Sequence, residues 1–343
     1  MSSHPLRVAV IGIDHRHAYG LLSGLVELGA RPVGWWTEGS PNTLEGFVKL
    51  FPDVPRVDDY RRLLDDKSVD IVVMAPEGAD RAGIAIEALE AGKDVMSDKP
   101  GVITLEELAA MRSAVERTGR IWSPNFAERF RIPSLVKAKE LIDAGEIGRV
   151  VHFNGLGPQR LRLNPRPQWF FEPRRFGGIL TDLMLHQFDN FIYLTGETQI
   201  DIAASWVGNF NQPDHPYFED LGEVTFGSQQ VRGYARVDWY TPDALPLNPG
   251  DGRITILGTD GYIEIRKFVD IAGRPGKEHL FIVNKTRCDY VDCSNLVVPG
   301  YHQLFMDDVR NRTETCLGHE HVFRVTELSI KAQNLSNSSR PAA

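Results

Sequence analysis

The stretch VAVIGIDHRHAYG, residues 8–20, runs from an apolar strand through a turn into a helix. A strand, a tight turn and a helix in this order open dinucleotide-binding domains, in which the turn carries the pattern G-x-G-x-x-G. Here Gly12 keeps the first glycine position, whereas Asp14 and His17 stand at the second and third. The stretch therefore predicts the first unit of a parallel α/β domain with a modified phosphate-binding turn.

The rest of the first third continues the same alternation of strand and helix. Short apolar runs alternate with amphipathic helical stretches, one of which opens with the capping-box pair Thr104 and Glu107. The apolar runs are residues 8–13, 31–36, 69–74 and 93–97. Repeated βαβ units predict a doubly wound parallel sheet, and we place this dinucleotide-binding domain at residues 1–125.

Beyond this region strands follow one another directly. Alternating apolar and polar positions, with turn signals such as GTDG, predict a large, open and mostly antiparallel sheet. We expect an α+β domain over residues 126–335 that binds the substrate and carries the oligomer contacts. The polar residues 336–343 are expected to form a disordered tail.

The composition narrows the class of protein. The 343-residue chain has a formal charge of −8, which argues against a nucleic-acid partner and against a polybasic membrane address. The N-terminus has no apolar leader, and no run is long enough to span a bilayer, so we expect a cytoplasmic protein. The cysteines, Cys288, Cys293 and Cys316, include no C-x-x-C pair and are interpreted as reduced and structural.

The turn after the first strand brings basic side chains to the start of a helix. Asp14 is expected to cap this helix, with His15, Arg16 and His17 in its first turn. Cations there oppose the helix dipole, and a bound phosphate would remove that conflict. The alternative is a solvent-exposed turn without a ligand. The histidine pairs His15/His17 and His319/His321 do not predict a metal site, because residues two apart do not share a helix face.

The end of the second strand bears on the choice of cofactor. An acidic residue that binds the adenosine ribose is expected about 20 residues past the turn. Thr37 and Glu38 lie there, and Glu38 would repel a 2′-phosphate while accepting hydrogen bonds from ribose hydroxyls. The sequence thus favours NAD over NADP, although NADP remains possible.

Two further patterns carry candidate chemistry. Lys99 precedes Pro100, so it is held extended at the carboxyl end of a strand, where open α/β sheets bind ligands. Asp182, His186 and Asp189 are spaced four and three apart, which predicts one helix face. A carboxylate one turn from an imidazole suits a general base. The alternatives are a solvent-exposed lysine and a helix with a solvated polar stripe.

Together these residues resemble the Gfo/Idh/MocA family of glucose-fructose oxidoreductases and inositol dehydrogenases. The resemblance covers residues 8–20, VDIVVMAP with EALEAGKDVMSDKP, the run GGxxxDxxxHxxD from Gly177 to Asp189, and the hairpin GTDGYIEI. It implies a Rossmann domain, bound NAD(P) and hydride transfer at a sugar or polyol hydroxyl, with Lys99, His186 and Asp182 as catalytic residues. The cofactor contacts implied by the fold are Gly12, Ile13, Asp14, His15, Arg16, His17, Thr37, Glu38, Pro76, Glu77, Asp98, Lys99 and Pro100.

The chain departs from the family pattern in two further places. The usual EKP is DKP here, and the common P-N-x-x-H is replaced by Pro76-Glu77-Gly78-Ala79-Asp80. These departures concern the pose of the cofactor rather than Lys99 and His186.

The segment PQRLRLNPRPQWFFEPRR, residues 158–175, holds five arginines and a single glutamate. Arginine suits carboxylate or phosphate and aromatic faces suit sugar rings, which favours an anionic sugar as substrate. The alternative is that the segment reaches a neighbouring subunit. The expected substrate contacts are Lys99, Arg160, Arg162, Trp169, Asp182 and His186.

Three functions are compatible with this sequence. The leading hypothesis is an NAD(P)-dependent dehydrogenase of a carbohydrate or cyclic polyol. The others are a non-catalytic cofactor-binding regulator and an enzyme that uses bound NAD for transient oxidation in glycoside cleavage or elimination. By analogy with the fold, we expect a homodimer or homotetramer that covers the open sheet.

Overall fold

The computed structural model describes residues 4–126, 128–163, 166–245 and 252–338. The chain forms two compact units. The first contains residues 1–126, 164–177 and 300–327, and the second contains residues 127–163, 178–299 and 328–343. The predicted domain bounds, 1–125 and 126–335, stay a prediction. The two units of the structure are discontinuous, because segments later in the chain return to the first unit.

The first unit is built on a five-stranded parallel sheet with the order β2-β1-β3-β4-β5. Its central strand β3 is buried at every position. This arrangement confirms the predicted doubly wound domain, in which the turns after β1, β3 and β4 meet at one edge of the sheet. The strands are β1 (Arg7–Ile11), β2 (Arg31–Trp36), β3 (Ile71–Met74), β4 (Asp94–Ser97) and β5 (Trp122–Pro124).

Helices alternate with these strands as the apolar periodicity predicts. The helices of the first unit include α1 (His17–Glu27), α2 (Leu44–Leu50), α3 (Arg61–Asp65), α4 (Arg81–Glu90), α5 (Leu105–Thr118), α7 (Pro173–Phe176) and α9 (Tyr301–Asn311). Helix α9 belongs here because the Tyr301 hydroxyl bonds to Ser123 at 2.8 Å beside β5. The start of α10 (His319–Ser338) joins the same unit, where Phe323 stacks on Trp122.

The second unit is an eight-stranded sheet with the order β13-β12-β11-β10-β6-β9-β8-β7. All neighbouring pairs are antiparallel except β6 with β9, which confirms the mostly antiparallel sheet. The strands are β6 (Val150–Pro158), β7 (Asp201–Gly208), β8 (Leu221–Gly227), β9 (Arg232–Asp238), β10 (Arg253–Gly258), β11 (Gly261–Lys267), β12 (Glu278–Asn284) and β13 (Cys288–Asp292).

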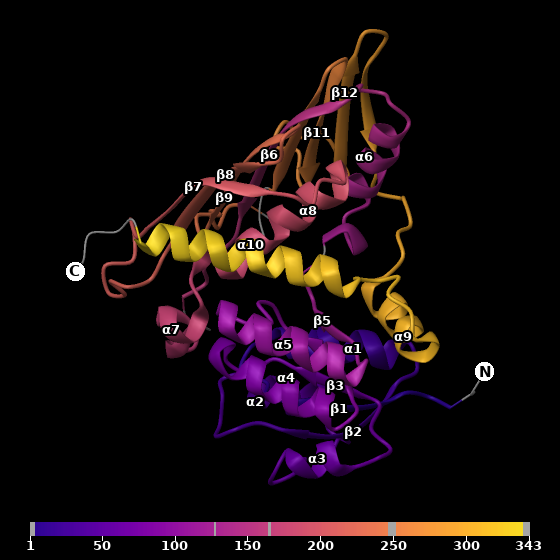
Figure 1. Cartoon of the computed structure of the whole chain (residues 1–343), viewed down its shortest axis with the longest axis vertical. Coiled ribbons are helices and arrows are strands. Elements are labelled where there is room, and N and C mark those ends of the chain that lie inside the picture. Colours follow the sequence, from indigo (N-terminus) through magenta and orange to yellow (C-terminus); the bar gives the residue numbers. More distant parts are fainter. Residues whose placement is uncertain (1–3, 127, 164–165, 246–251, 339–343) are drawn as a thin grey trace. The chain divides into compact units, whose positions relative to one another are not determined.

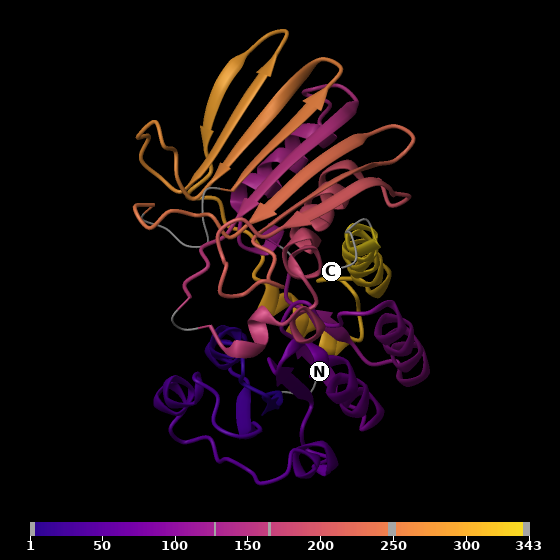
Figure 2. The ribbon, with the colours of Figure 1, turned by 90° about the vertical axis from the view of Figure 1, so that its left-hand side faces the viewer.

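Helices α6 (Pro133–Asp143) and α8 (Leu185–Thr195) lie on one face of this sheet (Figure 1, Figure 2). The strands alternate accordingly, since β10 buries Ile254 and Ile256 while the positions between them are more exposed. The opposite face exposes large side chains, among them Trp206 and Tyr262. One covered and one open face are what an antiparallel sheet with alternating residues produces.

The last helix extends further than the sequence suggested. Residues 336–338, which we assigned to a disordered tail, form the end of α10, and residues 339–343 lie outside the described part of the chain. The side chain of Gln333 fixes this end of α10 in the second unit by donating to Glu219 at 3.0 Å. Within the described residues, no helix is both long enough and apolar enough to cross a membrane.

The capping box of α5 gives a test of the first unit. The Thr104 hydroxyl accepts from the Glu107 amide at 3.1 Å, and the Glu107 carboxylate accepts from the Thr104 amide. We expect Thr104→Ala to lower the free energy of unfolding of this unit by about 1 kcal/mol, because an amide at the helix start loses its acceptor. Urea unfolding followed by circular dichroism measures the change.

Thr104→Ser is the matched control, because serine keeps the hydroxyl. Equal losses in the two variants would contradict a role for the capping bond.

Candidate functional site

The turn after β1 requires glycine at its first position. Gly12 has a φ of +75°, and a Cβ there would lie 2.5 Å from the Cβ of Pro76. The Gly12 amide donates to Trp36, and its carbonyl accepts from Ala75, so the turn is tied to β2 and to the end of β3. This close approach of three backbones is the geometry that the first glycine of a dinucleotide fingerprint provides.

Asp14 does not cap α1, contrary to our expectation. The helix begins at His17, with Arg16 at the cap position and no side-chain cap, because the loop remains irregular through His15. The Asp14 carboxylate instead lies 3.5 Å from the Thr37 hydroxyl. Burial, with Glu77 nearby, raises the pKa of Asp14 to about 6.

His15 and His17 converge on one carboxylate. The Nδ1 atoms of His15 and His17 each lie 2.7 Å from a different oxygen of Asp98. Our argument that residues two apart diverge fails because only His17 lies in the helix. Burial, then the charge of His17, lowers the pKa of His15 to about 3, so its ring is neutral near pH 7 and donates through Nδ1.

These three side chains are close enough together to hold a metal ion, since their ligand atoms lie within 4.8 Å of one another. Asp98 is nevertheless fully used without one. One of its oxygens accepts from His17 and the Lys99 amide, and the other from His15 and Arg81. The geometry is that of a complete hydrogen-bond network around a buried carboxylate.

Arg81, which was not predicted from the sequence, is the buried cation of this network. Its side chain is 2% exposed, and its guanidinium donates to Asp98 at 2.9 Å. It also donates to the carbonyls of Pro76, Lys99 and Pro100 at 3.0, 2.6 and 2.9 Å. The only signal in the sequence was an arginine just after the altered P-N-x-x-H segment, and that alone does not predict burial.

Lys99 lies where the sequence placed it, after β4 at the carboxyl edge of the parallel sheet. The residue is buried, its amide donates to Asp98 at 2.8 Å, and its bond to Pro100 is cis. Because Arg81 and Asp98 hold the backbone on both sides, Lys99 is not a lysine in open solvent. This excludes the alternative of a solvent-exposed lysine at this position.

The remaining predicted cofactor residues occupy different environments. Glu38 is exposed after β2, as a ribose ligand would be, whereas Thr37 is buried, with its hydroxyl 3.4 Å from the Ile13 amide. Arg16 is exposed beside the turn. Glu77 forms an ion pair with Arg175, one of the five arginines of residues 158–175.

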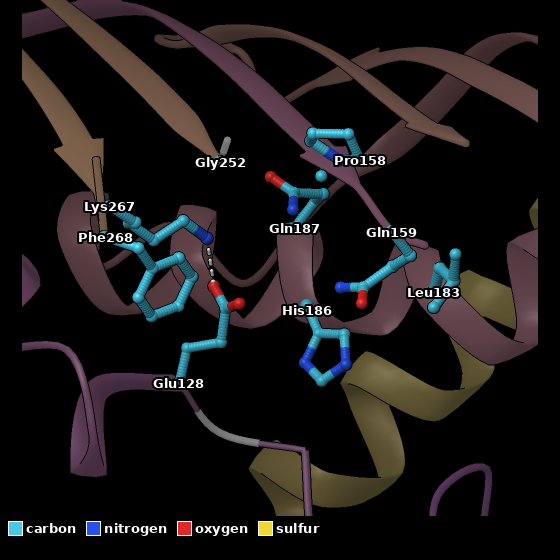
Figure 3. Close-up of a pocket in the computed structure, with 10 residues that line it drawn as sticks. Glu128, Pro158, Gln159, Leu183, His186, Gln187, Gly252, Lys267 and Phe268 are labelled. Atoms are coloured by element: carbon cyan, nitrogen blue, oxygen red, sulfur yellow. Dashed lines mark hydrogen bonds and ion pairs between the residues drawn. The ribbon is translucent and has the colours of Figure 1, made fainter. Parts of the chain in front are cut away.

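In the second unit, His186 lines a narrow pocket (Figure 3). The pocket is polar at its base, where Lys267 donates to Glu128 at 2.6 Å and both side chains are buried. Burial alone would raise the pKa of Glu128, but the charges of Lys267 and His186 lower it to about 2. The lining residues are Glu128, Gly157, Pro158, Gln159, Leu183, His186, Gln187, Gly252, Lys267 and Phe268.

The spacing of Asp182, His186 and Asp189 predicted one regular helix, but the structure shows a break in helical register. Leu180–Met184 forms a π-helical turn before α8 begins at Leu185, so Asp182 and His186 are separated by a change of helical register. Asp189 binds Arg129 at 3.1 Å. Neither Asp182 nor Asp189 is among the pocket residues that the structure describes.

Helix α8 is buried almost throughout, which excludes a solvated polar stripe. Its buried polar side chains are therefore expected to find partners. Asn190 donates to Glu128 at 2.9 Å, which links the helix to the base of the pocket. Glu128 and Lys267 were not predicted from the sequence, because their pairing joins residues 139 positions apart.

Among the described residues of the arginine-rich segment, the two arginines expected to bind the substrate lie away from the His186 pocket. Arg160 donates to the carbonyls of Pro242 and Leu245 at 2.8 and 2.6 Å, and Arg162 is exposed. Neither residue is among the described residues that line the His186 pocket. In the first unit, Trp169 is buried against Phe170 and therefore presents no open face to a ligand.

Comparisons with known proteins give a family match in each of the two units. A model of an oxidoreductase family with an NAD-binding Rossmann fold matches residues 6–126, and a GFO/IDH/MocA C-terminal domain model matches residues 135–264. The chain is 29% identical over 272 residues to scyllo-inositol 2-dehydrogenase (NAD(+)) of Bacillus subtilis, covering 76% of this chain and 74% of that protein. It is 33% identical over 210 residues to levoglucosan dehydrogenase of Pseudarthrobacter phenanthrenivorans, covering 59% of this chain and 52% of the relative.

Solved structures give the same result for the whole chain. The chain is 41% identical in sequence to an oxidoreductase from Erwinia carotovora atroseptica, and it matches the crystal structure of that protein with a TM-score of 0.91 and coverage of 97% of this chain and 99% of that one. Levoglucosan dehydrogenase in complex with NADH shares the fold at 21% identity, with a TM-score of 0.75 and 98% coverage of both chains. With the glycine-dependent turn after β1 and matches over both units, the chain belongs to the Gfo/Idh/MocA family of NAD-binding oxidoreductases.

Proposed function

We propose that the protein is an NAD-dependent dehydrogenase that acts on a hydroxyl or keto group of a sugar, a sugar derivative or a cyclic polyol. The observation that carries this proposal is the buried imidazole of His186 in a polar pocket of the second unit. The named dehydrogenases of inositol and levoglucosan among its relatives support the substrate class.

Each unit supplies its own part of the reaction. NAD, when bound, accepts or returns the hydride. His186 takes the proton of the substrate hydroxyl during oxidation and returns it during reduction. Lys99 donates a hydrogen bond to the reacting oxygen and stabilises the negative charge that develops there. Asp182 is proposed to orient the imidazole or to bind a neighbouring hydroxyl.

The pocket beside His186 favours an uncharged substrate over the anionic sugar considered from the sequence. Glu128 and Lys267 neutralise one another at its base. Glu278, which pairs with Lys267 in the β11–β12 register, has its pKa raised to about 7 by burial and so adds only part of a charge near neutral pH. Arg160 is engaged by backbone carbonyls. Among the described residues that line this pocket, the one lysine or arginine, Lys267, is thus already paired with a carboxylate.

The nucleotide specificity is proposed to be NAD. Glu38 stands exposed after β2, where its carboxylate would repel a 2′-phosphate. Arg56 lies nearby and donates to the carbonyls of Thr37 and Gly39 at 3.1 and 3.2 Å, so its guanidinium is engaged by the turn. Fluorescence titration with NADH and NADPH tests this choice, and equal affinities would contradict it.

A substrate screen tests the proposed activity. Formation of NADH is followed for inositols, anhydrosugars and aldoses, each compared with an acid-bearing analogue where one exists. We expect net NADH formation with an uncharged compound. Binding of NADH without net turnover of any compound would instead favour a regulator or transient oxidation.

The role of His186 gives a sharper prediction. His186→Ala is expected to lower kcat by about 10²- to 10⁴-fold while leaving the NADH dissociation constant nearly unchanged, because only the proton transfer is removed. His152→Ala on β6 is the control, since this histidine of the same unit does not line the pocket. An equal loss of NADH affinity in His186→Ala would contradict the assignment.

Asp14 predicts a pH dependence of cofactor binding. Its pKa is raised from 3.8 to about 6, so the carboxyl is neutral below pH 6 and negatively charged above it. If Asp14 lies beside the pyrophosphate, affinity for ADP-ribose falls as the pH rises from 5 to 7.5, because the new charge repels the phosphates. Calorimetry of the wild type and Asp14→Asn measures this.

The Asn variant is expected to bind with little pH dependence over this range. Parallel pH profiles for the two proteins would place Asp14 away from the phosphates.

A further inference from the structure

The turn after β1 lacks two of the glycines that normally shape it, so other contacts must hold it in place. The structure provides them through Arg81 and Asp98, which form a buried ion pair at the carboxyl edge of the parallel sheet. Arg81 is 2% exposed and Asp98 1% exposed, so neither is screened by water. Such a pair persists only where its remaining hydrogen-bonding atoms are also satisfied.

Both partners are satisfied by the loops around them. Arg81 donates to Pro76 after β3 and to Lys99 and Pro100 after β4. Asp98 accepts from His15 and His17 after β1, and from the Lys99 amide. The pair therefore joins the three loops that border the nucleotide edge of the sheet. We call Arg81, Asp98, His15 and His17 the buried hub.

We propose that Arg81 and Asp98 are positioning residues that fix the cofactor turn and the backbone of Lys99 as one rigid assembly. This inference rests on the proposed NAD-dependent function. It also states that the aspartate of the DKP segment is matched to the two histidines. A glutamate at this position would carry its carboxylate about 1.5 Å further and press it into the imidazoles.

The match between the Asp98 carboxylate and the two imidazoles accounts for the histidines of the turn and for the short acid before Lys99. His15 and His17 occupy the turn, and their rings meet edge to face with centroids 4.2 Å apart. They leave room for a short carboxylate that takes one hydrogen bond from each. Arg81, directly after the altered Pro76–Asp80 segment, then supplies the link between the loops.

The first experiment compares two buried aspartates at opposite ends of β4. Asp98→Asn removes the negative charge of the carboxylate that binds Arg81, His15 and His17. Asp94→Asn is the matched control, because Asp94 is also fully buried and binds an arginine, Arg312, at 2.7 Å, but lies at the amino end of the strand. The readouts are the melting temperature, the NADH dissociation constant and hydrogen exchange of residues 12–19 and of the Lys99 amide.

We expect both variants to lower the melting temperature, while only Asp98→Asn weakens NADH binding, by about tenfold or more, and speeds exchange in the two nucleotide-edge segments. Equal effects of the two variants on NADH binding and on exchange would show that the hub is merely structural and would overturn the inference. Absence of NADH binding by the wild type would instead contradict the proposed function.

The second experiment tests the match between acid and turn by a double-mutant cycle. Asp98→Glu alone is expected to weaken NADH binding by about tenfold, because the longer side chain displaces the imidazoles. In a His17→Gly background, which restores the third glycine position and clears space, the same change is expected to cost less than about threefold. A merely structural carboxylate would show no such rescue, and equal losses in both backgrounds would overturn the proposed match.

A third measurement separates the hub from a metal site at the same side chains. We expect no zinc in the purified protein by elemental analysis, and no change in NADH affinity on treatment with a chelator. Stoichiometric zinc that is lost in His15→Ala and His17→Ala would overturn the inference, because Asp98 would then be a metal ligand.

Discussion

The ion pair between Arg81 and Asp98 is the constraint on which the nucleotide edge depends. Burial alone would raise the pKa of Asp98, yet Arg81 and the two histidines hold it well below its ordinary value. The carboxylate is therefore charged throughout the physiological range and must remain paired. Because its partners come from three loops, the need to satisfy one buried charge fixes the relative position of all three.

This arrangement substitutes side-chain contacts for backbone flexibility. A glycine-rich turn approaches its ligand because it has no Cβ atoms, and Gly12 still performs that function against Pro76. At the positions of Asp14 and His17 the chain has side chains instead. His17 is held by Asp98, while Asp14 retains its proton until about pH 6. Burial therefore keeps Asp14 uncharged below about pH 6.

The features of the fold that were predicted correctly are those with a local signal in the sequence. The strand and turn at residues 8–12, the position of Lys99 before Pro100 and the capping box of Thr104 each depend on neighbours in the chain. The alternation of strand and helix gave the parallel sheet, and the period of two gave the antiparallel one. These patterns are legible because helix and strand geometry impose them on nearby residues.

The features that escaped prediction are pairings between distant segments. His15 and Asp98 are 83 positions apart, and Glu128 and Lys267 are 139 apart. No periodicity records such contacts, because they arise only when the loops are brought together by the sheets. The π-helical turn before α8 likewise cannot be read from the spacing of Asp182 and His186, since that spacing is compatible with a regular helix.

The arginines of residues 158–175 show how little composition alone says about the substrate. A cluster of cations in an acidic chain suggests an anionic ligand only if the guanidinium groups converge on open space. Arg175 binds Glu77 and Arg160 binds two carbonyls, while Arg166 lies over the ring of Phe170 with its guanidinium carbon 4.1 Å from the centroid. Each of these contacts holds an arginine of the described segment against other residues of the protein. The planar, multiply donating guanidinium is suited to such contacts as well as to ligand binding, so a high density of arginine in a sequence does not by itself identify an anionic ligand.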